Sequence, residues 1–277
     1  MRTNDQAIAF YRQHPISLEI VLKRLRTARG DLVGVKPEEL WPHDQDHYGG
    51  TGANDVLAER ASVGKGARVA DFCAGLGGPA RYMAHVHGAH VTGVELTPAR
   101  VAGARELTRL VGLEDRVEVL EGDVTAAPIA DGTMDAVVSQ EALLHVGDKA
   151  QAIAEAFRVL KKGGRFAFTD WTCNAPLSPE DAQLLWDGQA VQTLQSRDGY
   201  RARLEGAGFR IVGVQDLTAE WGPILRDRLR MYEAMRAEAA AAGTPPGTDA
   251  FHRSYVRFVA LVGEGRLGGL RATAEKP

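Results

Sequence analysis

The chain is poor in cysteine, carries no large excess of charge of one sign and has no long hydrophobic run. Its only cysteines, Cys73 and Cys173, lie far apart and outside any C-x-x-C pair, so we expect neither a disulfide nor a zinc site. The formal net charge of −3 offers no basic field for nucleic acid. The apolar runs are far shorter than the roughly 20 residues that span a bilayer, so we expect no membrane association.

The N-terminal stretch MRTNDQAIAFYRQHP lacks the charged start and the continuous apolar segment of a signal peptide, so we expect a cytoplasmic protein. Because 44% of the 277 residues are apolar, the chain can bury a full core. This composition favours a small soluble substrate. The sequence is compatible with a homo-oligomer but does not indicate the oligomeric state.

The most informative stretch, RVADFCAGLGGPA, runs from Arg68 to Ala80. It predicts a short strand that ends near Asp71, a turn containing Gly75 and Gly77, and then a helix. Such a turn lets a ligand approach the backbone N–H groups, as in nucleotide pockets. Alone it also fits the G-x-G-x-x-A pattern of NAD(P)-dependent oxidoreductases, so this alternative stays open here.

Acidic or polar residues also follow the next three predicted strands. The strand over 90–96 contains Glu95, twenty residues after Gly75, a spacing that suits a carboxylate on a ribose diol. The strand over 116–120 is followed by Asp123, and the strand over 134–139 by the segment SQEALLH. Because the carboxyl ends of parallel strands meet at one edge of a sheet, we expect these side chains to line one site.

This series resembles the class I S-adenosylmethionine-dependent methyltransferases. The resemblance implies that Asp71 lies near the methionine end of the cofactor, that Glu95 holds the ribose and that Asp123 accepts from the adenine amino group. S-adenosyl-L-methionine is therefore the expected cofactor. The full set of expected cofactor-binding residues is Asp71, Gly75, Gly77, Glu95, Leu96, Asp123, Val124 and Gln140. An oxidoreductase is disfavoured because Asp71 precedes the glycines and Asp123 has no role in a dinucleotide site.

The expected fold is α/β, a doubly wound seven-stranded, mostly parallel, Rossmann-like sheet with helical cover segments. We expect an N-terminal helical cover over residues 1–62 and a methyltransferase domain over 63–277. Helical insertions that cover the substrate are expected at about 172–197 and 219–266. The pattern also predicts an amphipathic helix over 16–27, a helix over 149–160, a turn at KKGG before a strand over 165–171, and a last strand over 270–275.

The segment after the fourth strand contains the expected catalytic residues. His145 is the predicted base, because an amine must lose a proton before it attacks a methyl group. Glu141 lies one helical turn before His145, so we expect both side chains to face one cavity, where Glu141 orients His145 or attracts a cationic substrate. The alternative is that His145 caps a helix or bonds a backbone carbonyl.

The region SQEALLH to FAFTDW resembles the sarcosine and dimethylglycine N-methyltransferases and the phosphoethanolamine N-methyltransferases. In the phosphoethanolamine enzymes this histidine acts together with a tyrosine. No tyrosine aligns with theirs, which leaves Tyr48 or Tyr11, and we take Tyr48 as the catalytic partner. The resemblance therefore implies a methyltransferase (EC 2.1.1 class) that acts on a small molecule, most simply an amine nitrogen; C- or O-methylation and a non-catalytic binding module are the alternatives.

Several positions depart from these families. Cys73 replaces the first glycine of D-x-G-x-G-x-G, so we expect a backbone conformation there that is open to a side chain. The phosphate-binding positions fall near Trp186, Ala190 and Gln192, which disfavours a phosphorylated amine. Five aromatic residues outside the predicted sheet are candidates for an aromatic wall around an ammonium group, or for packing contacts of the cover: Trp41, Tyr48, Trp171, Trp186 and Trp221. The histidine clusters HVHGAH and PHDQDH lack a complete ligand set, so no metal is expected.

Overall fold

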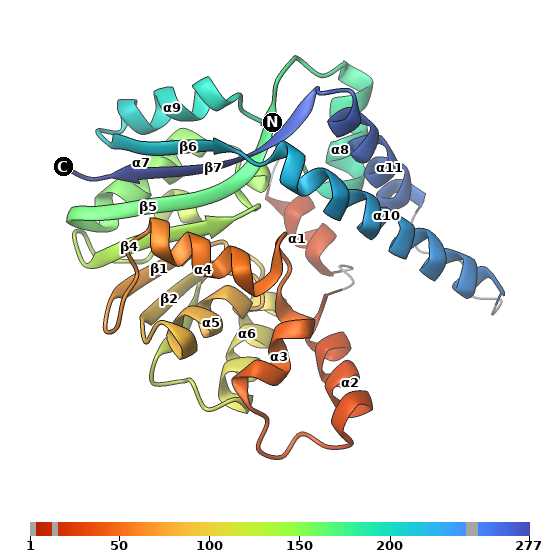
Figure 1. Cartoon of the computed structure of the whole chain (residues 1–277), viewed down its shortest axis with the longest axis horizontal. Helices are drawn as coiled ribbons and strands as arrows, with labels where there is room; N and C mark the ends of the chain where they lie inside the picture. Colours follow the sequence, from red (N-terminus) through yellow and green to blue (C-terminus); the bar gives the residue numbers. More distant parts are fainter. Residues whose placement is uncertain (1–3, 13–15, 242–248) are drawn as a thin grey trace.

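The computed structural model describes residues 4–12, 16–241 and 249–277, and has one sheet flanked by helices (Figure 1). The strands are β1 Arg68–Phe72, β2 His90–Glu95, β3 Val117–Glu121, β4 Met134–Gln140, β5 Leu160–Cys173, β6 Arg210–Asp216 and β7 Leu267–Glu275. The helices are α1 Asp5–Arg12, α2 Leu18–Arg29, α3 Pro37–Asp44, α4 Gly50–Arg60, α5 Gly78–Val86, α6 Pro98–Leu110, α7 Lys149–Val159, α8 Pro179–Gln189, α9 Arg197–Gly206, α10 Thr218–Ala241 and α11 Asp249–Gly263.

The seven-stranded sheet has the order β3-β2-β1-β4-β5-β7-β6. The first five strands in this order are parallel, whereas β7 runs antiparallel to both β5 and β6. The order reverses between β1 and β4, which makes the carboxyl ends of these strands the expected ligand crevice. The predicted α/β fold is therefore confirmed.

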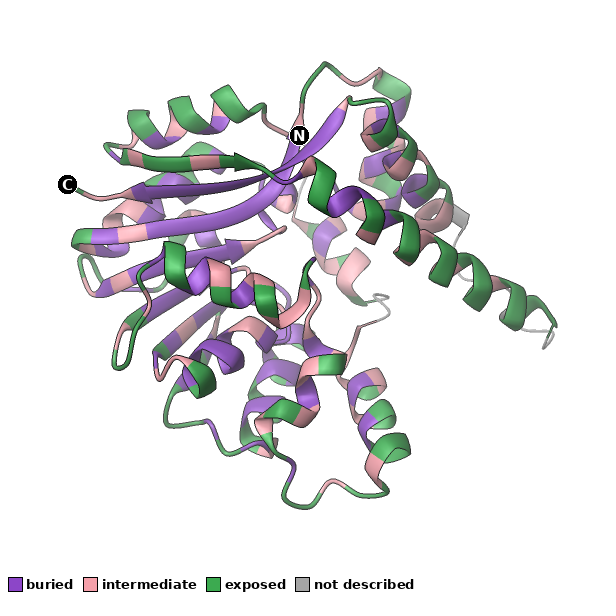
Figure 2. Ribbon diagram, in the orientation of Figure 1, coloured by how far each residue is buried: buried purple, intermediate pink, exposed green. Residues whose placement is uncertain are grey.

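Alternating residues of the strands belong to two hydrophobic layers. Val69 packs with residues of α2 to α6, and its neighbour Ala70 packs with residues of α7 and α9. This alternation is what a sheet covered on both faces requires. The central strands are accordingly buried along most of their length (Figure 2). A third cluster joins α8, α10 and α11 beyond the carboxyl edge of the sheet.

Most predicted elements lie within a few residues of the observed ones. The helix expected over 16–27 is α2, and the last strand begins earlier than expected, at Leu267. The residues of the expected turn, KKGG, lie inside the bounds of β5, but the pairing of β5 with β4 shifts register across them, from Met134–Leu160 to Ala136–Arg165, and Gly163 has a φ of +79°. The expected boundary at residue 62 stays a prediction, although helices on both sides of it share one hydrophobic cluster.

The described part of the chain holds two free cysteines, Cys73 and Cys173. Within residues 4–12, 16–241 and 249–277, no three His, Cys, Asp or Glu side chains come together in a way that suits a metal ion. None of the described helices combines the length and apolar character needed to cross a membrane.

Candidate active site

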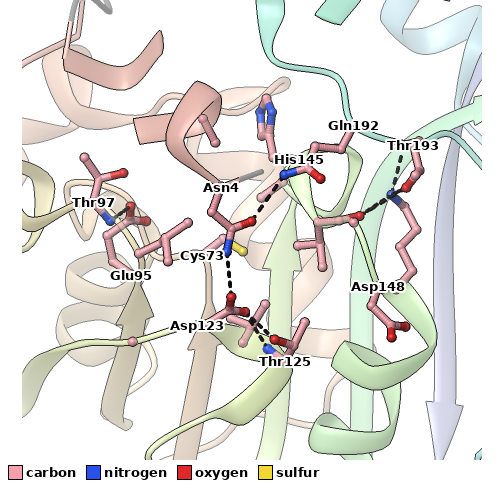
Figure 3. Close-up of a pocket in the computed structure, with 18 of the residues that line it drawn as sticks. Asn4, Cys73, Glu95, Thr97, Asp123, Thr125, His145, Asp148, Gln192 and Thr193 are labelled. Atoms are coloured by element: carbon pink, nitrogen blue, oxygen red, sulfur yellow. Dashed lines mark hydrogen bonds between the residues drawn. The ribbon is translucent and has the colours of Figure 1, made fainter. Parts of the chain in front are cut away.

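A cavity of about 670 Å³ lies at the carboxyl ends of the parallel strands (Figure 3). Four of the expected cofactor-binding residues line it: Glu95, Leu96, Asp123 and Val124. A smaller pocket of about 70 Å³ is lined by three others: Asp71, Gly75 and Gln140. Because Cys73 lines both, the two pockets adjoin. The strand ends predicted from the sequence therefore do meet at one edge of the sheet.

The glycine turn needs its glycines. Gly75 and Gly77 have φ values of +57° and +74°, in the left-handed region that side chains rarely adopt. The N–H of Gly75 donates to a carboxylate oxygen of Glu95 at 2.9 Å. A Cβ atom on Gly75 would also lie only 2.8 Å from the guanidinium of Arg100. The turn thus brings its backbone against the ribose-binding carboxylate expected from the sequence.

Cys73 does not have the ordinary backbone that the sequence suggested. Its φ is +63°, so the residue that replaces the first glycine of the pattern keeps the conformation of a glycine. Burial raises the pKa of its thiol well above the usual value, which keeps the sulfur protonated. The expectation about this backbone is therefore corrected: the site stores local strain at the junction of the two pockets.

The carboxylate of Asp123 has donors on both oxygens. Oδ1 accepts from the backbone N–H of Thr125 at 2.8 Å and from its hydroxyl at 2.7 Å. Oδ2 accepts from the side-chain amide of Asn4 at 2.8 Å, and the amide oxygen of Asn4 accepts in turn from Gln192 at 3.3 Å (Figure 3). Asn4 thus donates to the carboxylate that we expect to accept from adenine. Nothing in the local sequence indicates this contact.

The smaller pocket contains buried polar atoms without partners among the described residues. Oδ2 of Asp71 and Oε1 of Gln140 are acceptors without a donor, and Nε and Nη1 of Arg100 are donors without an acceptor. Arg100 also pairs with Asp46 at 2.8 Å. Burial, and secondarily the charge of Glu95, raises the pKa of Asp71 to about 7. Two free acceptors beside two free donors complement the ammonium and carboxylate of an α-amino acid, which is the methionine end of the expected cofactor.

His145 contacts Tyr11 of α1. The hydroxyl of Tyr11 lies 3.0 Å from Nε2, and Nδ1 lies 3.0 Å from the carbonyl oxygen of Ala190. Because a carbonyl only accepts, Nδ1 carries a hydrogen, and the neutral imidazole accepts the Tyr11 hydroxyl proton at Nε2. The centroid of the Phe10 ring lies 6.1 Å from that of the imidazole. The backbone contact considered for His145 is thus present, and it leaves the second ring nitrogen to Tyr11, which lines the cavity with His145.

Glu141 does not face His145. Its carboxylate accepts from the backbone N–H of Tyr48 at 2.7 Å and from the hydroxyl of Thr169 at 2.5 Å, and it lines the smaller pocket. The expectation of a shared helical face is corrected, because Glu141 has a φ of +44° and only a short 3₁₀ turn, Leu143–His145, follows it. Burial raises the pKa of Glu141 to about 7.

Tyr48 is not the tyrosine beside His145. Its ring packs edge-on against Trp171, with the ring centroids 5.6 Å apart, and its centroid is 5.3 Å from that of Trp221. Tyr48 therefore belongs to the third hydrophobic cluster, which includes residues of α10 and α11. The expected pairing of Tyr48 with His145 is therefore corrected to Tyr11. Trp41 packs against Tyr82 of α5, among the helices on one face of the sheet.

A buried cation and a buried carboxylate hold the loop that carries His145. The ammonium of Lys149 donates to the carbonyl of Thr193 at 2.9 Å and to the hydroxyl of Thr193 at 2.5 Å. Asp170 accepts from the backbone N–H of Leu144 at 3.2 Å and from the hydroxyl of Tyr200. Burial lowers the pKa of Lys149 to about 8 and raises that of Asp170 to about 6. These residues fix the loop between β4 and α7. The sequence analysis contained Asp170 only as part of the motif FAFTDW and assigned neither Asp170 nor Lys149 a role.

Comparison with known proteins identifies the family. A family model described as a methyltransferase domain matches residues 70–168. The 27-O-demethylrifamycin SV methyltransferase of Amycolatopsis mediterranei is 30% identical over 234 residues, which cover 82% of this chain and 84% of that protein. The chain belongs to the class I methyltransferase family. This membership replaces the alternative of an NAD(P)-dependent oxidoreductase.

Two curated N-methyltransferases are also similar to this methyltransferase. The glycine/sarcosine/dimethylglycine N-methyltransferase of Actinopolyspora halophila is 33% identical over 185 residues, which cover 66% of this chain and 33% of that protein. The sarcosine/dimethylglycine N-methyltransferase of Halorhodospira halochloris is 32% identical over 188 residues, which cover 65% of this chain and 66% of that protein. The matches thus span between a third and about two thirds of the length of these relatives. The expected resemblance is confirmed.

Solved structures share the fold of this methyltransferase. The cyclopropane synthase MmaA2 from Mycobacterium tuberculosis has a TM-score of 0.77 at 15% identity, over 99% of both chains. The phosphoethanolamine N-methyltransferase 2 of Haemonchus contortus, solved with S-adenosylhomocysteine, has a TM-score of 0.74 at 20% identity, over 95% of this chain and 60% of that one. S-adenosyl-L-methionine is confirmed as the cofactor of the family, whereas acceptors differ among proteins of this fold.

Proposed function

We propose that the protein transfers a methyl group from S-adenosyl-L-methionine to the nitrogen of a small amine. The observation that carries the proposal is the hydrogen bond between Tyr11 and His145, which lies over the cavity lined by the expected cofactor residues. The names of the relatives from Actinopolyspora halophila and Halorhodospira halochloris, which act on glycine, sarcosine or dimethylglycine, support an amine acceptor.

The cofactor, when bound, supplies an electrophilic methyl group on a sulfonium. We assign its methionine end to Asp71, Gln140 and Arg100, because their unpartnered atoms suit an ammonium and a carboxylate. We assign the ribose to Glu95 and the adenine to Asp123, next to Leu96 and Val124. Arg100 extends the set expected from the sequence. Asp123 would exchange the hydrogen bond that it accepts from Asn4 for one from the adenine amino group.

Tyr11 and His145 can take the proton that a protonated amine must lose. The ammonium donates to the hydroxyl oxygen of Tyr11 as Tyr11 passes its own proton to Nε2 of His145. The carbonyl of Ala190 already holds Nδ1–H, so it stabilises the imidazolium that results. Burial raises the pKa of the Tyr11 phenol, so this side chain relays a proton without remaining ionised.

The test is transfer of labelled methyl groups to glycine, sarcosine and dimethylglycine, with His145→Ala and Tyr11→Phe beside the unchanged protein. We expect losses of about 10²- to 10⁴-fold in kcat with nearly unchanged affinity for S-adenosylhomocysteine. Tyr82→Phe is the matched control, because the hydroxyl of Tyr82 bonds Asp55 outside the cavity. Full turnover by His145→Ala would remove the base role, and no methylated amine from any acceptor would contradict N-methylation.

O-methylation is a second candidate. The A. mediterranei relative is named as a methyltransferase of 27-O-demethylrifamycin SV. It aligns over 82% of this chain, which is too much to leave out all of the expected cover segments. The same Tyr11–His145 pair would take the proton of a hydroxyl group. Mass analysis of the product separates a methyl ether from a methylated amine. A small-molecule acceptor fits either candidate, and a cytoplasmic location remains a prediction.

A further inference from the structure

Arg100 lines the smaller pocket and contacts a residue of the larger one. Its side chain, which is 5% exposed, extends from the first turn of α6 to the glycine turn at Gly75, because helical side chains tilt toward the helix N-terminus. One of its nitrogens pairs with Asp46 at 2.8 Å, and its guanidinium carbon lies 4.4 Å from the centre of the Tyr11 ring. Arg100 thus joins the pocket of the methionine end to the tyrosine beside His145.

The guanidinium of Arg100 keeps two nitrogens for a ligand. Nη2 donates to Asp46, whereas Nε and Nη1 are buried and have no hydrogen-bond partner among the described residues. An N–H group withdrawn from water without an acceptor costs free energy, so a carboxylate that accepts from one of these nitrogens stabilises the guanidinium in this position. The carboxylate that we assign to this place belongs to the methionine end of the cofactor.

The same guanidinium lies over the ring of Tyr11. A cation over an aromatic ring is attracted to its π electrons, and the attraction is strongest where water is excluded. The Tyr11 ring also meets the imidazole of His145 edge-on, with the ring centroids 5.3 Å apart. The hydrogen bond between the Tyr11 hydroxyl and Nε2 of His145 therefore depends on a ring that Arg100 contacts as well.

Two side chains on one face of the N-terminal segment attach it to the cofactor residues. Asn4, directly before α1, donates to Asp123, and Tyr11, seven residues later and thus on the same helical face, lies against Arg100. Because we assign the adenine to Asp123, the contact of Asn4 is lost when the cofactor binds. Of these two attachments, the contact between Arg100 and Tyr11 then remains.

We propose that Arg100 is a positioning residue that couples binding of the methionine end of the cofactor to the placement of Tyr11 on His145. Arg100 binds the cofactor carboxylate through Nε or Nη1 and thereby holds its guanidinium against the ring of Tyr11. The ring of Tyr11 serves this coupling, whereas its hydroxyl serves the proton relay. The inference rests on the proposed function, because it concerns the same tyrosine and histidine, but its test requires no methyl acceptor.

The test is hydrogen exchange of the backbone amides of α1, measured without ligand, with saturating S-adenosylhomocysteine and with saturating 5′-methylthioadenosine. The second ligand has the adenosine and the thioether but lacks the amino-acid end. The variants are Arg100→Met, Tyr11→Phe, which keeps the ring, and Tyr11→Leu, which removes it. Arg109→Met is the control on α6, because that side chain is 61% exposed. Melting temperatures verify that each variant folds.

We expect S-adenosylhomocysteine to slow exchange in α1 at least about fivefold in the unchanged protein, Arg109→Met and Tyr11→Phe, and less than about twofold in Arg100→Met and Tyr11→Leu. We expect 5′-methylthioadenosine to slow it less than about twofold in every protein. The comparison of the two ligands and that of the two Tyr11 variants decide even where Arg100→Met binds too weakly to be saturated.

Equal protection of α1 by the two ligands would overturn the inference, because the amino-acid end would then have no part in it. Equal protection in Tyr11→Phe and Tyr11→Leu, or no protection of the unchanged protein by S-adenosylhomocysteine, would overturn it as well. The expected pattern of protection without a methylated amine from any acceptor would instead contradict N-methylation alone.

Discussion

The hydroxyl of Tyr11 lies 3.0 Å from Nε2 of His145, although 134 residues separate them in the sequence. The other imidazole nitrogen is held by the carbonyl of Ala190, a residue that ends α8 in the left-handed conformation. Three separate segments therefore set the position of one imidazole. Movement of α1 would both break the bond to His145 and uncover the cavity that Asn4 and Tyr11 line.

Glu141 should make the stability of the protein depend on pH. Burial raises its pKa to about 7, with Arg228 opposing the shift, so the folded state favours the protonated acid. This contribution is fully present below the unfolded pKa of roughly 4.3 and is lost as the pH rises through about 7. Glu141→Gln removes the titration, and an amide suits both the Tyr48 N–H and the Thr169 hydroxyl.

We expect Glu141→Gln to gain roughly 2–3 kcal/mol relative to the unchanged protein between pH 5 and pH 8. Urea unfolding at the two pH values measures the difference. Asp71, whose pKa is raised mainly by burial, titrates in both proteins, so its contribution cancels. An identical pH dependence for the two proteins would exclude the shift.

The backbone at Cys73 should prefer glycine. With a φ of +63°, a side chain there is strained by about 1–2 kcal/mol. We expect Cys73→Gly to be about 1 kcal/mol more stable than Cys73→Ala, since the two variants differ only in the Cβ atom. At a helix or strand position with negative φ, the alanine variant is instead the more stable one, by about 0.5–1 kcal/mol. Thermal unfolding of the two variants measures this difference in stability. A Cys73→Ala variant more stable than Cys73→Gly would show that the backbone at this position is not strained.

Gly78 should not tolerate a side chain. A Cβ atom there would lie 2.2 Å from the backbone oxygen of Asp44, so α5 and α3 would have to separate. We expect Gly78→Ala to cost at least about 1–3 kcal/mol. The matched control, Gly206→Ala near the end of α9, meets no atom within 4 Å and should gain up to about 1 kcal/mol. Chemical denaturation gives the free energy of unfolding of both variants. Similar values for the two would show that α5 and α3 accommodate the added Cβ atom without cost.

The ion pair between Asp44 and Arg81 should contribute far more than an exposed one. The two side chains are 1% and 2% exposed and lie 2.8 Å apart. Asp44→Ala leaves a buried cation unpaired, which costs about 3–5 kcal/mol. Glu106→Ala breaks an exposed pair with Arg109 on α6 and should cost less than about 1 kcal/mol. Comparable losses of unfolding free energy in the two variants would contradict this ranking.

The cofactor side of the site was predictable from sequence because its residues follow strands. Apolar runs fix the strands, parallel strands end at one edge, and residues such as Asp71, Glu95 and Asp123 are thereby brought together. The resemblance to methyltransferases then assigned each residue a role. Arg100 escaped notice because it lies in the first turn of α6, away from any strand end, and only the fold brings it to the glycine turn.

The acceptor side was predicted poorly because its contacts join distant segments. The pairing of Tyr11 with His145 depends on how α1 returns across the sheet edge, which no local pattern encodes. Helical spacing predicted the wrong neighbour for Glu141, because its left-handed backbone turns the side chain toward Thr169 instead of His145.

The most direct test is calorimetry of S-adenosylhomocysteine binding to the unchanged protein and to Asp71→Asn, Glu95→Ala and Asp123→Ala. Asp115→Asn is a control, because that carboxylate is exposed and outside both cofactor pockets. The account predicts micromolar binding by the unchanged protein and the control, weakened at least about tenfold in each of the three site variants. Absence of binding to the unchanged protein, or equal affinity in all variants, would contradict the cofactor site.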